Sequence, residues 1–195
     1  MKNVHIIAAF ALLLGQLPAH AVVTCETENT RAPATSPTAS FILHTDGTAT
    51  DTTTGLMWMR CSLGQTWNGD TCSGNANTYT WQEALQRAQD INFGISNADN
   101  DNAVGFAGYT DWRLPNKNEL ESIVELRCRN PAINAAIFPA IPSTSSFWSS
   151  SPYEDLNDTA LAWRIDFWNG EVLLSKRNDY EELQSYSARL VRAGR

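Results

Sequence analysis

Four cysteines constrain the fold of this chain more than any other feature, because the sequence also predicts that the protein is exported. Lys2 is followed by the apolar run IIAAFALLLG and then by Ala19-His20-Ala21, which is the order of a secretory signal peptide. The run is too short to span a bilayer as a helix. We therefore expect residues 1–21 to be a signal peptide. The mature protein is expected to be periplasmic, secreted or on the cell surface, without membrane insertion.

The even cysteine count predicts two disulfides, for which three connectivities exist. Cys61 and Cys72 flank the polar loop SLGQTWNGDT, whose Asn68-Gly69 pair is a turn signal, and this favours the pair Cys61–Cys72. Cys25–Cys128 follows by elimination and would tie the N-terminal tail to a helix. The alternative is a catalytic or metal-binding thiol pair, which the lack of a CxxC motif disfavours.

Charge and histidine content exclude several classes of function. Loss of the signal peptide removes Lys2 and no acid, so the net charge falls from −7 to −8. An acidic chain lacks the clustered cations that nucleic acids require, so no nucleic-acid partner is expected. The signal peptide also contains His5 and His20, which leaves His44 as the last histidine. A multi-histidine metal site and most histidine-based catalysis are thereby excluded.

Removing 21 of the 195 residues leaves 174, enough for one domain with a sizeable core. Residues 22–40 are rich in Thr, Pro and Ala and predict an extended leader, and residues 41–195 predict a single domain. Strand-like runs occur at 41–44 and 54–60. Thr80 and Glu83 then form a capping box that predicts the start of a helix ending near Gly94.

The stretch DWRLPNKNEL, residues 111–120, predicts a joint between an extended segment and a second helix. Asn116 and Glu119 form a second capping box, and Pro115 holds the preceding chain extended. The helix is expected to bury one face, which consists of Leu120, Ile123, Val124 and Cys128.

Strands dominate the last third of the chain. Asn169-Gly170 lies between two apolar runs and predicts a two-residue hairpin turn of type I′. That register places Trp163, Ile165, Phe167, Val172 and Leu174 on one face, and Arg164, Asp166, Trp168 and Leu173 on the other. Two early helices and a C-terminal antiparallel sheet indicate an α+β domain.

Five segments together resemble the Lcl C-terminal domain family: TGLMWMRC, GYTDWRLPNKNELESIV, FWSSSPY, AWRIDFWNGEV and ARLVR. The resemblance covers about residues 41–192. It implies a C-type-lectin-like domain in an exported or surface protein, and the family's namesake binds sulfated polysaccharides and glycosaminoglycans. The joint is also similar to one in formylglycine-generating enzymes. Those enzymes need a C-terminal cysteine pair, and no cysteine follows Cys128, so their activity is not implied.

Two acidic loops are candidates for a calcium site. NADNDN contains Asp99 and Asp101, and YEDLND contains Asp155 and Asp158. Calcium takes six to eight oxygen ligands of this kind, although neither loop has an EF-hand spacing. The alternative is that both loops are simply solvated. Apart from calcium, no cofactor is expected.

The C-terminal strands contain candidates for an aromatic glycan-binding surface. Sugar rings stack on aromatic faces while neighbouring polar groups bind their hydroxyls. This logic selects a set of five candidates: Trp168, Asp166, Arg164, Tyr153 and Tyr180. A basic patch is a further candidate for acidic or sulfated ligands, made of Lys176, Arg177, Arg189, Arg192 and Arg195, with Arg189 expected at the surface. The alternatives are packing under a loop for the aromatics and charge balancing for the cations.

Catalysis is the weakest interpretation, because no G-x-S-x-G elbow occurs and His44 has no evident partner. We therefore expect a non-catalytic binding module that recognises glycans in adhesion or surface attachment. The second interpretation is a structural or assembly component of the envelope or of a surface appendage, with a protein partner.

Overall fold

The computed structural model describes residues 25, 27–95, 104–142, 146–154, 160–177 and 184–194. The predicted signal peptide lies outside these residues. The strands in the described part are β1 (Thr27–Glu28), β2 (Phe41–Leu43), β3 (Thr48–Asp51), β4 (Leu56–Met59), β5 (Thr66–Trp67), β6 (Cys72–Ser73), β7 (Cys128–Arg129), β8 (Ser146–Tyr153), β9 (Leu161–Asp166), β10 (Glu171–Lys176) and β11 (Val191–Ala193). The helices are α1 (Trp81–Phe93) and α2 (Lys117–Glu121), with a 3-10 turn at Thr38–Ser40.

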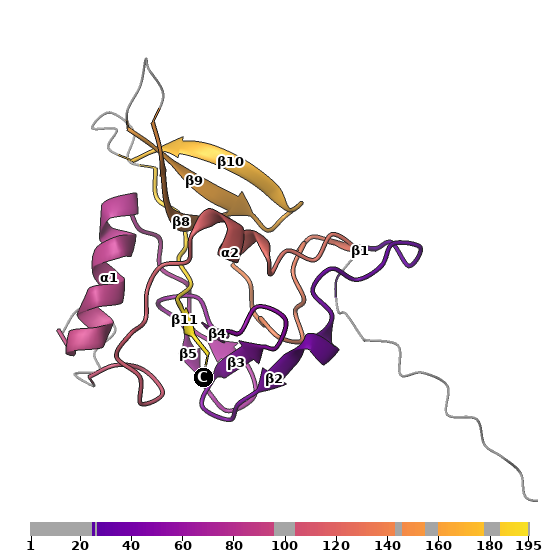
Figure 1. Cartoon of the computed structure of the whole chain (residues 1–195), viewed down its shortest axis with the longest axis horizontal. Coiled ribbons are helices and arrows are strands. Elements are labelled where there is room, and N and C mark those ends of the chain that lie inside the picture. The colour runs from indigo at the N-terminus through magenta and orange to yellow at the C-terminus, as the bar shows by residue number, and fades with distance from the viewer. Residues whose placement is uncertain are drawn as a thin grey trace, which may run out of the picture.

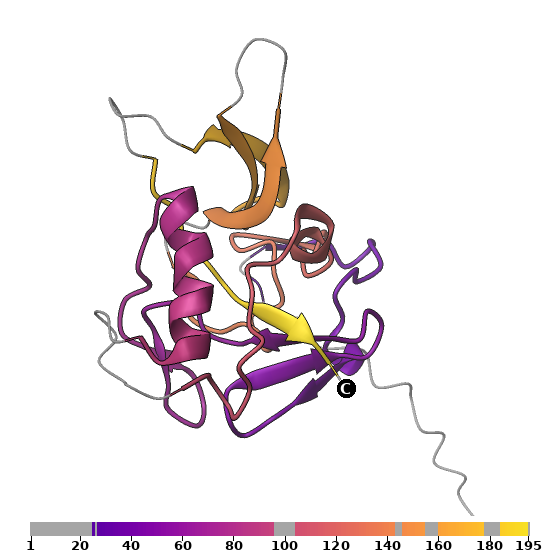
Figure 2. The same cartoon turned by 60° about the vertical axis from the view of Figure 1, so that its left-hand side comes forward.

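The strands form two main antiparallel sheets, with the orders β11-β4-β3-β2 and β10-β9-β8, and two short ladders, β1-β7 and β5-β6. In Figure 1 the β8–β10 sheet lies above, the β2–β4 sheet lies below, and α1 runs along one side. The turned view in Figure 2 shows the last strand, β11, lying with the lower sheet. This combination of helices and antiparallel sheets is consistent with the predicted α+β class.

Helix α1 confirms the capping prediction at both ends. The Thr80 hydroxyl accepts a hydrogen bond from the Glu83 backbone N–H at 3.3 Å, and the Glu83 carboxylate accepts from the Thr80 N–H at 2.8 Å. Gly94 ends the helix in the left-handed region, with a φ of 62°, where glycine carries no Cβ penalty. Ala84 and Ala88 are buried against the core, as the helical spacing predicts.

Helix α2 has the predicted capping box at Asn116 and Glu119, but it is only one turn long. The prediction that its face continues to Cys128 was wrong, because Cys128 lies on β7. Ile123 and Val124 enter the core, and the Glu125 N–H then donates to the Ala132 carbonyl at 3.0 Å. The backbone therefore pairs with the segment that follows it instead of continuing as a helix.

The Arg113–Glu119 pair that fixes the start of α2 makes stability depend on pH. Two hydrogen bonds of 2.7 and 2.6 Å join the side chains and lower the pKa of Glu119. Because the folded pKa lies below the unfolded value, the pair stabilises the fold above the unfolded pKa, and this stabilisation is lost as the pH falls through the folded pKa. Since Arg113 is 46% exposed, we expect Glu119→Gln to lower the free energy of unfolding at pH 7 by about 1 kcal/mol.

Urea unfolding of the wild type and Glu119→Gln, at neutral pH and at a pH below the folded pKa, measures this effect. The two proteins should converge in acid. Glu121→Gln is the matched control, because Glu121 is exposed and pairs only with Lys117 at 3.4 Å. An equal difference between the wild type and Glu119→Gln at both pH values would contradict the prediction.

Both predicted disulfides are present, Cys25–Cys128 and Cys61–Cys72. The second closes the loop that contains β5 and β6, and Asn68 accepts hydrogen bonds from the Asp70 and Thr71 N–H groups at its tip. The first joins the N-terminal segment to β7 and not to a helix. Paired cysteines are compatible with a periplasmic or extracellular location.

The β9–β10 hairpin differs from the predicted two-residue turn. Asp166 pairs with Glu171, so the loop has four residues, 167–170, and type I′ was wrong because Gly170 has a positive φ whereas Asn169 does not. Phe167 turns inward and its ring lies 5.3 Å from that of Phe147. The register shifts by an even number of residues, so the predicted faces of the two strands are retained.

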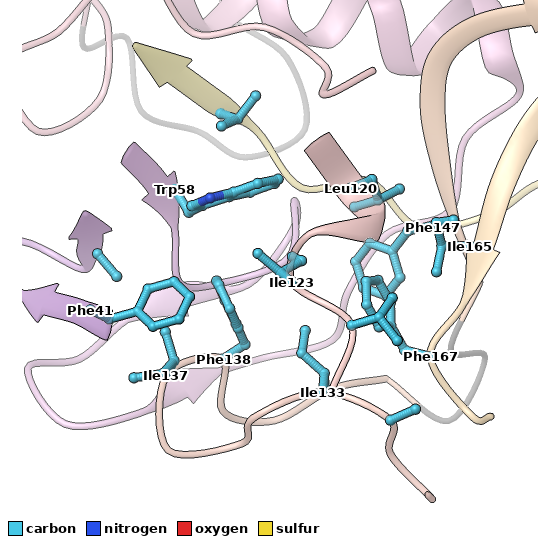
Figure 3. Close-up of a cluster of buried hydrophobic side chains, with 14 residues drawn as sticks. Phe41, Trp58, Leu120, Ile123, Ile133, Ile137, Phe138, Phe147, Ile165 and Phe167 are labelled. Carbon is cyan, nitrogen blue, oxygen red and sulfur yellow. The ribbon is translucent and has the colours of Figure 1, made fainter. Parts of the chain in front are cut away.

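Two hydrophobic clusters form the interior. The first lies between the sheets and is shown in Figure 3, with Trp58, Phe138 and Phe147 among its largest members. The second packs α1 against Trp112, Trp148 and Leu190. Trp112, in the joint segment, is buried and its indole N–H donates to the Phe106 carbonyl at 3.0 Å. The joint is therefore part of the scaffold, as predicted.

Candidate functional site

Arg164 and Asp166, two of the predicted ligand-binding residues, lie together on β9 with their charged atoms 3.9 Å apart. Arg164 donates to the Ser175 hydroxyl at 2.7 Å, and its guanidinium lies 4.4 Å from the centre of the Tyr186 ring. One oxygen of Asp166 accepts from the Trp168 N–H at 2.8 Å. Much of the hydrogen-bonding capacity of this pair is therefore used to hold the hairpin.

The two remaining aromatic candidates that the structure describes, Trp168 and Tyr153, do not gather around that pair. Trp168 lies in the hairpin loop and is 52% exposed. Tyr153 pairs with Leu161, which places it on the opposite face of the sheet from Arg164, and its ring packs 5.4 Å from that of Trp163. Tyr180 lies outside the described residues. Of the aromatic candidates within the described residues, Trp168 is thus the exposed one.

The predicted exposure of Arg189 was wrong. The side chain is fully buried, and its guanidinium lies 4.7 Å from the centre of the Phe138 ring and donates to the Met59 carbonyl at 2.9 Å. Burial lowers its pKa to about 9, and the nearby charge of Arg60 acts in the same direction. The alternation rule failed because core side chains cover this segment on both faces. Arg192 is also buried, 2.6 Å from Asp111, and Arg195 lies outside the described residues.

The four calcium candidates, Asp99, Asp101, Asp155 and Asp158, lie outside the described residues. Among the residues that the structure does describe, no three His, Cys, Asp or Glu side chains come together as metal ligands. In the same part of the chain, no helix has the length and apolar content needed to cross a membrane.

A cleft of about 560 Å³ lies between the Cys61–Cys72 loop and the C-terminal end of α1. Its apolar and aromatic lining comes from Met59, Leu63, Trp67, Ile91 and Phe106, and its polar lining includes Asp46, Gln65 and Asn77. Ligand pockets in proteins occupy roughly 300–1,000 Å³ and combine an apolar lining with a few polar groups. The cleft therefore has the size and the composition of a binding site for a small ligand.

Trp67 is held in the cleft from several sides. Its indole N–H donates to the Thr45 carbonyl at 3.0 Å, and the Arg60 guanidinium lies 4.1 Å from its ring centre. Gly47 lies so close that a Cβ there would be 2.6 Å from the Trp67 Cγ, which requires glycine at this position. Such fixed rings lose little entropy when a ligand stacks on them.

Asp46 supplies a carboxylate at the same cleft. Its Oδ1 accepts from the Thr48 N–H at 3.0 Å and from the Thr48 hydroxyl at 2.7 Å, which fixes the turn between β2 and β3. Oδ2 makes no hydrogen bond within the described part of the chain. This oxygen can accept a hydrogen bond from a ligand hydroxyl.

The sequence analysis did not predict this cleft, because it interpreted residues 62–71 only as a polar loop between two paired cysteines. One signal was available. Trp67 is a large aromatic in a polar, glycine-containing loop and belongs to no periodic core face. A residue of that kind needs a packing or binding partner that periodicity does not supply.

Antiparallel sheets, two short helices and two disulfides define a disulfide-stabilised domain of mixed α and β structure with a ligand-sized cleft. The model of the Lcl C-terminal domain matches residues 47–192, and the chain belongs to this family. The match begins at the turn before β3 and extends into β11, so β1, β2 and Cys25 lie before it. A search of curated proteins finds no match to the chain.

Proposed function

We propose that this protein is an exported, non-catalytic binding module that recognises glycans in adhesion or surface attachment, in the periplasm or at the cell surface. The observation that supports this most directly is the cleft, which is lined by both the fixed Trp67 and Asp46. Aromatic faces stack on sugar rings and carboxylates accept sugar hydroxyls. The family match supports the proposal by kinship, and on that ground we propose a C-type-lectin-like relationship for the fold.

The states of the reactive side chains support a binding role over a catalytic one. All four cysteines are in disulfides. His44 shares a 2.9 Å hydrogen bond with the Thr50 hydroxyl, and Glu125 is buried among backbone donors. The His44–Thr50 contact has the distance of a hydroxyl–imidazole pair, but within the described residues no third group orients the imidazole, as covalent catalysis requires.

A protein partner is the alternative, and the edge of the lower sheet favours it. β2 is the edge strand of the order β11-β4-β3-β2, and its Ile42 and Leu43 are 54% and 44% exposed. An edge strand with exposed apolar side chains can pair with a strand of another protein. In this case the protein would be a component of a surface structure and would not bind sugars.

Binding of the oxidised protein, residues 22–195, to an array of neutral, acidic and sulfated glycans tests the proposal. We expect selective binding that free sugar competes away. Running the array with calcium and with chelator tests the calcium hypothesis for Asp99, Asp101, Asp155 and Asp158. Trp168→Ala tests the hairpin surface in the same format. A blank array from a folded sample would contradict glycan recognition and direct the search to cross-linked protein partners.

A further inference from the structure

We propose that the cleft at Trp67 takes an uncharged sugar and rejects sulfated or otherwise anionic glycans. This inference rests on the proposed function and adds the site and the ligand class. Three observations support it. Within the described residues, Asp46 Oδ2 makes no hydrogen bond; the Trp67 ring is fixed; and Arg60, the cation that contacts this ring, already donates to two backbone carbonyls.

The charge of the cleft is the first argument. None of the described residues that line it is basic, and Asp46 is an acid. Asp70 lies close enough to act on the charge of Arg60. A sulfate group entering this cleft would approach the Asp46 carboxylate, and no described lining residue supplies a compensating cation. Like charges in a partly enclosed site repel each other strongly.

Arg60, the cation in contact with Trp67, has two of its three guanidinium nitrogens engaged by backbone carbonyls. Its Nε donates to the Ile137 carbonyl at 2.9 Å and its Nη2 donates to the Ala136 carbonyl at 3.1 Å, while its planar face lies on the indole. The side chain is buried, and burial lowers its pKa. Arg60 therefore orients Trp67, and the Nε–Nη2 fork that arginine uses to bind sulfate is already occupied by the carbonyls of Ile137 and Ala136.

The groups that remain available suit hydroxyls. Asp46 Oδ2 can accept a hydrogen bond from a sugar hydroxyl, and this bond is charge-assisted. Trp67, which lines the cleft and is partly exposed, offers an apolar aromatic surface to the C–H groups of a sugar ring. Gln65 contributes less, because its amide already bonds to Ser62, Gly74 and Ala140.

Calorimetric titration with matched neutral and sulfated glycans tests the inference. The probes are oligomers of glucose, mannose and N-acetylglucosamine, together with dextran, dextran sulfate and heparin. We expect at least one neutral probe to bind with an affinity that hardly changes with salt, and dextran sulfate and heparin to bind more weakly or not at all. Asp46→Asn should lower the affinity for the neutral probe about tenfold or more, because it removes a charge-assisted hydrogen bond.

Two controls separate binding from folding. In Asp46→Asn the side-chain oxygen can still accept the hydrogen bond from the Thr48 N–H, so the turn is retained. Asp70→Asn removes a neighbouring acid that does not line the cleft, and this variant should bind with unchanged affinity. Trp67→Ala should abolish measurable binding, with urea unfolding used to show that the variant is folded. Trp168→Ala should bind as the wild type does.

The outcomes distinguish this inference from the proposed function. Selective binding of the sulfated probes would overturn the uncharged-ligand inference and leave glycan recognition standing. Binding of a neutral probe that Asp46→Asn and Trp67→Ala both leave intact would place the site elsewhere and would also overturn it. No binding of any probe by the folded protein would overturn the inference and the proposed function together.

Discussion

Replacing Arg189 by alanine is expected to lower the free energy of unfolding by about 4 kcal/mol, because the change creates a cavity and leaves buried carbonyls without a donor. Arg189 lies under the rings of Phe138 and Phe147, at 4.7 and 5.6 Å from their centres. It donates to the backbone carbonyls of Met59 and Arg60. The side chain therefore joins β8 to the end of β4. An apolar residue of the same size could pack under the rings but could not donate hydrogen bonds to the two carbonyls.

Urea unfolding with both disulfides intact measures this loss. Arg189→Met is the informative companion, because it keeps most of the volume while removing the charge and the donors, and it should lose less stability than Arg189→Ala. Arg113→Ala is the control for removal of a cation that is half-exposed. If Arg189→Ala cost no more than Arg113→Ala, the role assigned to the buried guanidinium would be wrong.

The second large effect is expected for Glu125→Ala, with a loss of about 3 kcal/mol, because one buried and two partly buried N–H donors would lose their acceptor. Glu125 is fully buried. Its carboxylate accepts from the Thr35 N–H at 3.0 Å, the Ser36 N–H at 2.9 Å and the Arg127 N–H at 3.0 Å. The carboxylate thus holds the N-terminal segment against the domain.

Hydrogen exchange separates a local effect from a global one. In Glu125→Ala we expect the amides of Thr35 and Ser36 to exchange faster than those of β9, because their acceptor is gone while the sheet remains. In Glu125→Gln these two amides should exchange at rates between those of the wild type and Glu125→Ala, because the amide oxygen of glutamine can still accept a hydrogen bond. Glu171→Ala, at an exposed position, is the control. Unchanged protection of both amides in Glu125→Ala would contradict the role of this carboxylate in holding the N-terminal segment against the domain.

The elements that depend on interactions between residues close in the sequence could be predicted from the sequence. Both capping boxes consist of two side chains three residues apart, so the starts of α1 and α2 follow from local hydrogen bonding. The Cys61–Cys72 disulfide closes a short loop. The faces of β9 and β10 follow from alternation, which an even shift in register preserves.

Features set by distant contacts could not be predicted in this way. Helix α2 ends early because Glu125 and Ala132 pair their backbones. Arg189 is buried because Phe138 and Phe147 cover it, and arginine is almost never fully buried without such partners. The cleft is lined by the turn at Asp46, the disulfide loop, the end of α1 and the segment at Gly105 and Phe106. The hydrophobic periodicity of a single segment cannot predict a site to which several distant segments contribute.

The position of β11 has a consequence for how the chain acquires its structure during synthesis. Val191 pairs with Trp58 of β4 on one side and exchanges two backbone hydrogen bonds of 2.9 Å with Arg113 on the other. The pairing of β4 is therefore complete only after β11, far later in the sequence, has been synthesised. Pairings this distant make folding slow, and until then the chain exposes unpaired strand edges. We expect this protein to depend on a holding chaperone until β11 has been synthesised, and we expect deletion of β11 to destabilise the fold.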